Sequence, residues 1–200
     1  MADTAKTLVF ATANRNKLIE ASRVLGEGFV LKLPAELGYT NDVPETHLTI
    51  RENAIEKAQF IRDMFGMDCF ADDTGLEVDA LDGAPGVFSA RYAGEPKDPV
   101  QNVRKLLRQM EGIPYTQRTA RFRCAIALIE DGVLHTFEGI CEGHISLKPQ
   151  GQLGFGYDPV FVPAGMEKTM AMLSLDEKNA ISHRGKALDM LVCHLRNPHA

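Results

Sequence analysis

The sequence has few cysteines, and it lacks the C-x-x-C pairs and ligand spacings of a zinc site. Three of the four lie in apolar stretches, where a free cysteine usually acts as a small buried hydrophobe. Unclustered cysteines in a chain of this size suggest a reducing compartment. No apolar run approaches the ~20 residues that span a bilayer, and Met1 to Lys6 lacks the basic and apolar regions of a signal peptide. We therefore expect a cytoplasmic protein with no membrane partner.

An excess of basic residues is also missing. Lysine and arginine number 22 against 27 acidic residues, which gives a net charge of -5. This balance argues against nucleic acid bound through a general positive field, but it allows a local basic pocket for one phosphorylated small molecule. The sequence shows no internal repeat, low-complexity tract or linker, so we expect one domain over residues 1–200.

The pattern of apolar residues and turn signals predicts a mixed α/β fold. Asn14 can cap the first helix, Thr49 opens a capping box at the start of the second, and Asp-Gly at 131–132 predicts a hairpin. We expect strands at 7–12, 29–33, 69–71, 119–129 and 133–145, and helices from Asn14 to Gly26 or Gly28, at 50–65, at 98–110 and from Ser182 or His183 onward.

The helix at 50–65 has a clear apolar stripe. Its members are Ile50, Ala54, Ala58, Ile61 and Phe65. We expect Lys57 to lie mostly off this stripe.

Asp72-Asp73-Thr74-Gly75 is the most informative stretch, because it follows the short strand expected at 69–71. Two adjacent carboxylates with a hydroxyl and a glycine suit a divalent cation that prefers oxygen ligands. The alternative is an ordinary acidic turn. Phe70-Ala71 should be buried, and an acid pair beside it is costly unless a cation compensates it. The context favours a functional site.

Two basic segments point to an anion. Lys17 follows the turn 12–16 at the start of a helix, where backbone N–H groups and the helix dipole attract anions, although the glycines of a P-loop are absent. The segment 178–186 places His183 and Arg184 in the first turn of a helix, where cations oppose the dipole unless an anion or an acceptor-rich base compensates them. In each case the alternative is a solvated surface charge.

A glycine-rich loop and several histidines complete the candidates. In Gly154-Phe155-Gly156-Tyr157-Asp158 the glycines suggest backbone close to a flat ligand, with an aromatic ring free to stack; a turn with a core aromatic is the competing interpretation. His47, His135, His144 and His194 show no ligand spacing and are interpreted as surface or core residues.

Taken in order, these motifs resemble those of the inosine triphosphate pyrophosphatase family, the dITP/XTP pyrophosphohydrolases. The resemblance runs from about Val9 to Leu195. It rests on the segments 12–17, 52–58, 71–76, 83–92, 154–159 and 182–188.

The resemblance implies an elongated, two-lobed α/β fold with a mixed sheet, flanking helices and the active site in the cleft between the lobes. It also implies Mg²⁺-dependent hydrolysis of ITP, dITP or XTP to the monophosphate and pyrophosphate. Mn²⁺ stays open as an alternative ion, because carboxylate and water ligands suit both ions. Family members are typically homodimers.

Residue roles follow from the same resemblance. Asp73 matches the catalytic carboxylate, which is both proton acceptor and metal ligand, while Glu45 and Asp72 are further metal ligands. The triphosphate turn comprises Thr12, Ala13, Asn14, Arg15, Asn16 and Lys17, and Lys57 and Arg91 add positive charge. Thr74 contacts phosphate. The nucleotide-binding positions are Phe155, Gly156, Tyr157, Asp158, Lys178, His183 and Arg184, of which Phe155 stacks on the purine and His183 and Arg184 favour a 6-keto base.

Two other functions stay open at this point. The same fold could act on a modified pyrimidine triphosphate, as its Maf-like relatives do. A nucleotide sensor that binds without hydrolysis is the second alternative, but a sensor could dispense with Glu45, Asp72 and Asp73, which are all present.

Overall fold

The structure is a computed structural model that describes residues 5–197, and its contacts divide the chain into two compact units. The first unit holds the described residues up to Asp73, together with Cys124–Gly139 and those from Arg184 onward; the second holds Thr74–Arg123 and Ile140–His183. Within the described residues, no helix is long and apolar enough to cross a membrane.

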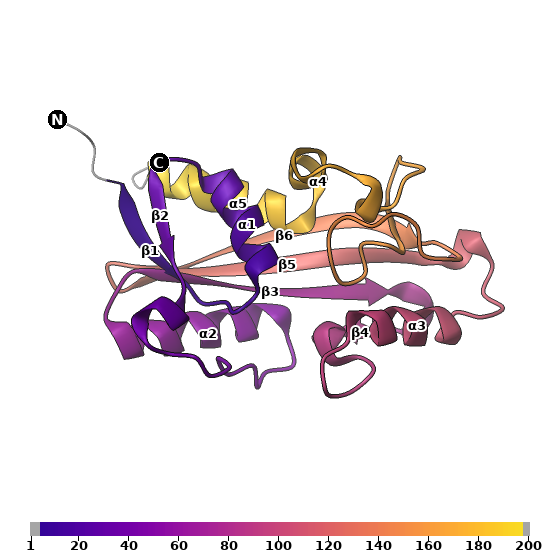
Figure 1. Cartoon of the computed structure of the whole chain (residues 1–200), viewed down its shortest axis with the longest axis horizontal. Helices are drawn as coiled ribbons and strands as arrows, with labels where there is room; N and C mark the ends of the chain where they lie inside the picture. The colour runs from indigo at the N-terminus through magenta and orange to yellow at the C-terminus, as the bar shows by residue number, and fades with distance from the viewer. Residues whose placement is uncertain (1–4, 198–200) are drawn as a thin grey trace. The chain divides into compact units, whose positions relative to one another are not determined.

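Strands and helices alternate through the first half of the chain, and Figure 1 labels most of them. Their bounds are β1 (Lys6–Phe10), α1 (Arg15–Leu25), β2 (Phe29–Lys32), α2 (Ile50–Phe65), β3 (Cys69–Val78), β4 (Pro85–Gly86), α3 (Pro99–Gln109), β5 (Thr119–Glu130), β6 (Val133–Ile145), β7 (Phe161–Pro163), α4 (Leu175–Ile181) and α5 (His183–Arg196). Short 3-10 helices lie at Pro34–Leu37, Asp79–Leu81, Ser89–Arg91, Tyr115–Gln117 and Met170–Met172.

Hydrogen bonds join the strands into a seven-stranded mixed sheet in the order β2-β1-β3-β5-β6-β7, with β4 paired to β3. In the first unit β1 is parallel to both β2 and β3. The prediction of a mixed α/β sheet with flanking helices is therefore confirmed. The elongated shape, the cleft and the single-domain organisation stay predictions.

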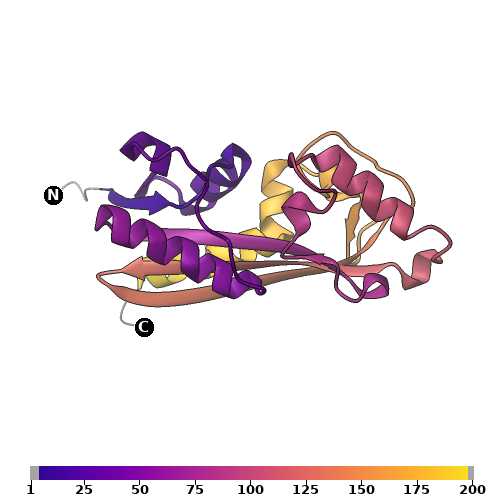
Figure 2. The same cartoon turned by 90° about the horizontal axis from the view of Figure 1, so that it is seen from below.

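In the first unit the strands carry helices on both faces. On one face α1 and α5 pack on β1, β3 and β5, around Phe10 and Phe70, whose rings stack with centroids 4.3 Å apart. On the other face lies α2, and the Cys69 thiol donates to the Ala58 carbonyl. Figure 1 shows α2 on the side of the strands opposite α1 and α5, and Figure 2 shows it in front of them. Residues of opposite parity along β3 thus face different helices.

Local signals explain most of the boundaries. Asn14 caps α1, and Gly26 ends that helix with a φ of 73°. Asp131 and Gly132 both have positive φ, 50° and 79°, which is the conformation of a two-residue type I′ turn. The predicted hairpin is therefore confirmed.

The second unit has its own core. The apolar side of α3 packs against residues of β3, β5 and β6. This cluster comprises Leu76, Val78, Val103, Leu106, Met110, Ala120, Phe122, Cys141, Ile145, Tyr157, Val160, Phe161 and Met170.

The strand predicted at 69–71 is too short, because β3 continues from Cys69 to Val78. Asp72 and Asp73 therefore lie within a strand and not in a turn at its end. The acidic residues are tolerated there because each has a cationic partner, as described below.

Candidate active site

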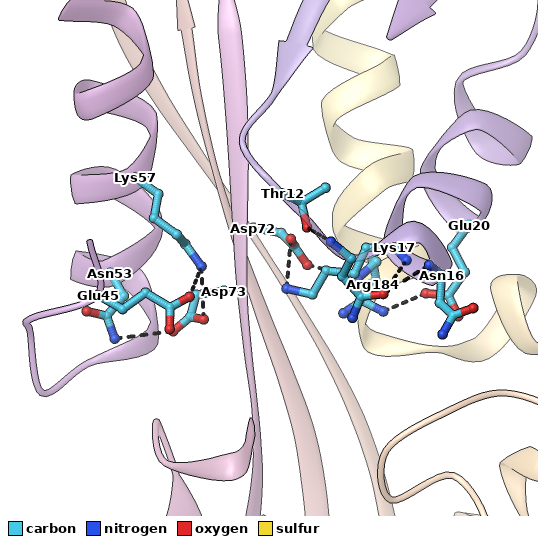
Figure 3. A network of polar contacts seen from close by, with 11 residues as sticks. Thr12, Asn16, Lys17, Glu20, Glu45, Asn53, Lys57, Asp72, Asp73 and Arg184 are labelled. Carbon is cyan, nitrogen blue, oxygen red and sulfur yellow. Dashed lines mark hydrogen bonds and ion pairs between the residues drawn. The ribbon is translucent and has the colours of Figure 1, made fainter. Parts of the chain in front are cut away.

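The alternation of side chains along β3 places Asp72 and Asp73 on opposite faces of the strand. Figure 3 shows the two carboxylates on either side of the β3 ribbon, each with its own partners. The expectation that they form one paired-carboxylate site is wrong in this respect. Asp73 faces α2, whereas Asp72 faces α1 and α5.

On the α2 side, two carboxylates converge on one ammonium group. Lys57 Nζ donates to Glu45 Oε1 at 2.6 Å and to Asp73 Oδ1 at 3.2 Å. Asn53, one helical turn before Lys57, donates to Asp73 Oδ2 at 3.3 Å. Lys57 is only 4% exposed, so the prediction that it lies off the buried face of the helix is wrong. The carboxylates of Glu45 and Asp73 thus lie together around the buried ammonium group of Lys57.

The loop that carries Glu45 is fastened to α2 by side chains of the helix. Glu56 accepts from the Thr46 backbone N–H at 2.8 Å and from its hydroxyl at 2.7 Å. Asn53 Oδ1 accepts from the His47 N–H at 2.9 Å. Asn53 therefore holds both the loop and Asp73, and it fixes how the two carboxylates face each other.

Burial and charge act in opposite directions at this site. Burial raises the pKa of Asp73 above its ordinary value, and the attraction of Lys57 and Lys17 does not cancel the effect. Burial alone would lower the pKa of Lys57, but the Asp73 and Glu45 carboxylates raise it. A lysine that stays charged beside a carboxylate with a raised pKa is an arrangement suited to proton transfer next to an anionic substrate.

On the other face, Asp72 belongs to a buried ion network. Lys17 Nζ donates to Asp72 Oδ1 and Arg184 Nε to Asp72 Oδ2, both at 2.9 Å, while Arg184 Nη1 donates to Glu20 Oε2 at 2.5 Å. Asp72, Arg184 and Glu20 are each at most 3% exposed. Although burial opposes it, the charges of Lys17 and Arg184 hold the pKa of Asp72 well below its usual range. Asp72 ties α1 and α5 to β3.

We therefore expect low pH to lower the free energy of unfolding, because it protonates Asp72. Because the folded-state pKa is depressed, the stabilisation is present above the unfolded-state pKa of about 4 and is lost as the pH falls below it. We expect the free energy of unfolding of Asp72→Asn to be lower than wild type at pH 7 and to fall less steeply below pH 4. Urea unfolding between pH 2.5 and 7 measures both slopes. Parallel slopes would contradict the role assigned to Asp72.

The predicted triphosphate turn forms the start of α1. Asn14 Oδ1 accepts from the backbone N–H of Asn16 at 2.9 Å and of Lys17 at 3.4 Å, and Thr12 Oγ1 accepts from the Asn14 N–H at 3.1 Å. Ala13, Arg15 and Asn16 are exposed. The turn is thus a pre-ordered helix N-terminus, a setting that favours anions.

The remaining predicted residues lie in the second unit. Asp158 Oδ2 accepts from Lys178 Nζ at 2.6 Å and from the Phe155 N–H at 2.8 Å, and Lys178 Nζ lies 4.6 Å from the centre of the Phe155 ring. Asp158 and Lys178 are buried, so one ion pair fixes the loop 154–158 and its aromatic ring.

The other side chains of this group have separate surroundings. The buried Tyr157 hydroxyl donates to the Ser89 carbonyl at 2.9 Å. The His183 ring stacks on Phe122 with centroids 4.6 Å apart, and the guanidinium of Arg91 lies 5.4 Å from the centre of the Phe88 ring. Thr74 follows Asp73 on β3 and is half-buried, as is Gly156 in the loop.

Two glycines in this loop give a matched test. A Cβ at Gly154 would lie 2.2 Å from Asp158 Oδ2, whereas a Cβ at Gly156 would meet nothing within 4 Å; both residues have positive φ, 73° and 61°. We expect Gly154→Ala to lower the free energy of unfolding by about 1–3 kcal/mol more than Gly156→Ala, since both share the left-handed strain and only the first clashes. Thermal unfolding of the two variants measures the difference. Equal losses would show that the Asp158 contact does not constrain Gly154.

Sequence reasoning missed Asn53 and Glu20. Asn53 precedes Lys57 by four residues, so the two share a helix face, and this spacing was the available signal. Glu20 lies beside Ala21 and four residues before Val24, at the border of an apolar stripe. Glu20 does not stand out until the sheet and the neighbouring helix are in place.

Comparison with known proteins identifies the family of this chain. A model of the Ham1 family matches residues 8–194. A dITP/XTP pyrophosphatase of Flavobacterium psychrophilum is 46% identical over 190 residues, covering 95% of this chain and 99% of the relative, and that of Bacillus subtilis is 47% identical over 188 residues, covering 93% and 95%. The Ham1 protein of Staphylococcus aureus has a TM-score of 0.86 at 39% identity, covering 96% of this chain and all of the other. The family resemblance is confirmed, and the chain belongs to the Ham1 family.

Proposed function

We propose that the protein hydrolyses non-standard purine nucleoside triphosphates, namely ITP, dITP and XTP, to the monophosphate and pyrophosphate. The observation that carries this proposal is the convergence of Glu45 and Asp73 on the buried Lys57. Relatives 46–49% identical over nearly the whole chain are named dITP/XTP pyrophosphatases, which supports the same substrates.

The donor set fits a divalent cation. Glu45 and Asp73 offer carboxylate oxygens, the ligands that Mg²⁺ prefers, and they lie close enough to share one ammonium group. Asp72 is engaged by Lys17 and Arg184 on the other face of β3, so we assign the metal to Glu45 and Asp73 only. When bound, Mg²⁺ would neutralise phosphate charge and polarise a phosphoryl oxygen; Mn²⁺ suits the same ligands.

The chain's own groups then have distinct tasks. Asp73 accepts the proton of the water molecule that attacks the α-phosphorus, while the bond from that phosphorus to the bridging oxygen breaks and pyrophosphate leaves. Lys57 offsets charge on the phosphate oxygens, and the N-terminus of α1 with Lys17 supplies further positive potential. Phe155 stacks on the purine, and His183 donates to a 6-keto oxygen.

Isotope labelling of the products tests the reaction. ITP is incubated with the protein in ¹⁸O-labelled water, with Mg²⁺ or with EDTA. We expect IMP and pyrophosphate with Mg²⁺ only, and the label in IMP, because the water attacks the α-phosphorus. Label in pyrophosphate, or orthophosphate as the product, would place the cleavage at another bond. ITP bound but not cleaved would favour the sensor alternative.

The homodimer that the resemblance implies and a cytoplasmic location belong to the same proposal. Light scattering on the purified protein tests the dimer directly. A monomer at all concentrations would contradict it.

A further inference from the structure

Three side chains with metal-binding groups lie together at the turn of the β5–β6 hairpin. Glu130 is the last residue of β5, His135 lies near the start of β6, and His194 comes from α5. One ligand atom from each lies within 4.8 Å of the others. Glu130 Oε2 and His194 Nε2 are 3.2 Å apart, and the centroids of the two imidazole rings are 4.2 Å apart. This group is separate from Glu45, Lys57 and Asp73.

We propose that Glu130, His135 and His194 bind a late first-row divalent metal ion, with Zn²⁺ as the reference ion. Two imidazoles and one carboxylate suit Zn²⁺, Co²⁺ or Ni²⁺ better than Mg²⁺, which prefers oxygen ligands alone. Three protein ligands would leave a fourth position for water.

The observed spacing is close to what such an ion needs. Ligand atoms about 2.0–2.2 Å from a tetrahedral ion lie roughly 3.3 Å from one another. The Glu130–His194 distance of 3.2 Å already meets this value, and the widest separation of 4.8 Å or less needs a contraction of roughly 1.5 Å at most. All three residues are half-buried, and the contraction requires rotation of their side chains.

The three ligands come from three elements, namely β5, β6 and α5. The tight turn at Asp131 and Gly132 places Glu130 and His135 near each other, and the Asp131 N–H donates to Asp68 Oδ1 at 3.0 Å. The ring of His194 lies against Phe137, with centroids 5.6 Å apart. A bound ion would therefore fasten α5 to the hairpin.

The positive charge of Lys6 lies beside Glu130 and would repel a bound metal ion. Lys6 pairs with Oε1 of Glu130 and lies 3.8 Å from Asp68 Oδ2. His194, in contrast, contacts Oε2 of Glu130. Lys6 and His194 contact different oxygens of Glu130. Oε2 can therefore coordinate a metal ion while Lys6 keeps its contact with Oε1 or moves into solvent. The competing interpretation is a Glu130–His194 ion pair with ring packing alone.

Zinc titration of the full metal-free chain tests the site. Excess Mg²⁺ is present so that Glu45 and Asp73 do not contribute, and a chromophoric chelator reports free Zn²⁺. We expect one equivalent per chain in wild type, at least a tenfold loss of affinity in His135→Ala and in His194→Ala, and no change in His144→Ala, which alters another histidine of β6. Cys193→Ser is the second control, because this exposed cysteine precedes His194.

Two further readouts do not depend on the variants. At a hundredfold excess of Zn²⁺ over its Kd we expect the Tm of wild type to rise by roughly 5 °C or more. Histidine ring resonances in the NMR spectrum should shift for His135 and His194 and not for His144. Unchanged resonances, affinity retained without both histidines, or affinity abolished by Cys193→Ser would overturn the proposal.

Discussion

Replacing Asp73 by Asn is expected to lower kcat for ITP by about 10²–10⁴-fold, the usual contribution of a positioned proton acceptor. The fold should tolerate the change. Burial disfavours the charged form of Asp73 and raises its pKa, so a neutral amide of the same shape removes an unfavourable ionisation, and Lys57 keeps its contact with Glu45. Initial rates and thermal unfolding of the same preparation measure both effects.

The control is Asp63→Asn, which removes an exposed carboxylate from α2. It should change neither kcat nor Tm. A titration with Mg²⁺ separates the two roles of Asp73, because added metal restores rate only if the residue acts chiefly as a ligand. An Asp73→Asn variant with wild-type kcat would remove Asp73 from the mechanism.

Arg184→Met is expected to give the largest loss of stability. The change leaves Glu20 and Asp72 buried with one cation fewer. Breaking a buried pair in this way typically costs about 3–5 kcal/mol, which corresponds to a fall in Tm of roughly 6–20 °C for a chain of this size. Urea and thermal unfolding measure it.

Two further variants provide a control and a rescue for Arg184→Met. Arg23→Met removes an exposed arginine from α1 and should cost less than about 1 kcal/mol. Adding Glu20→Gln to Arg184→Met should restore part of the lost stability, because one unpaired carboxylate is removed. If Arg184→Met lowered the free energy of unfolding by less than about 1 kcal/mol, solvent would reach the network of Glu20, Asp72 and Arg184. Asp72 would then not depend on Arg184 for its compensation.

Much of the fold could be predicted from local signals, but the acidic pair on β3 depends on partners that are distant in the sequence. The strand was expected to end before Asp72 and Asp73, because aspartate is a poor strand former. Within β3 they are compensated by Lys17, Arg184 and Lys57, which come from three different helices. Such compensation depends on the packed structure, and no local pattern contains it.

Lys57 was misplaced for a related reason. Its spacing of three residues from Ala54 and four from Ile61 puts it on the apolar stripe of α2, but a lysine is assigned to solvent by default. The helix α4 was missed because seven residues are too few for a periodic pattern, although Ser174 and Glu177 form a capping box at its start. The histidines of the proposed zinc site belong to different elements, so only the fold brings them together.

Pyrophosphate release from ITP, dITP, XTP, ATP and GTP, each with Mg²⁺ and with EDTA, tests the central claim most directly. We predict turnover only with Mg²⁺, fast for the first three and slow for ATP, whose 6-amino group cannot accept from His183, and for GTP, in which the 2-amino group would be excluded. Equal rates for ATP and ITP, or a preference for a modified pyrimidine triphosphate, would contradict the assignment to the purine pool.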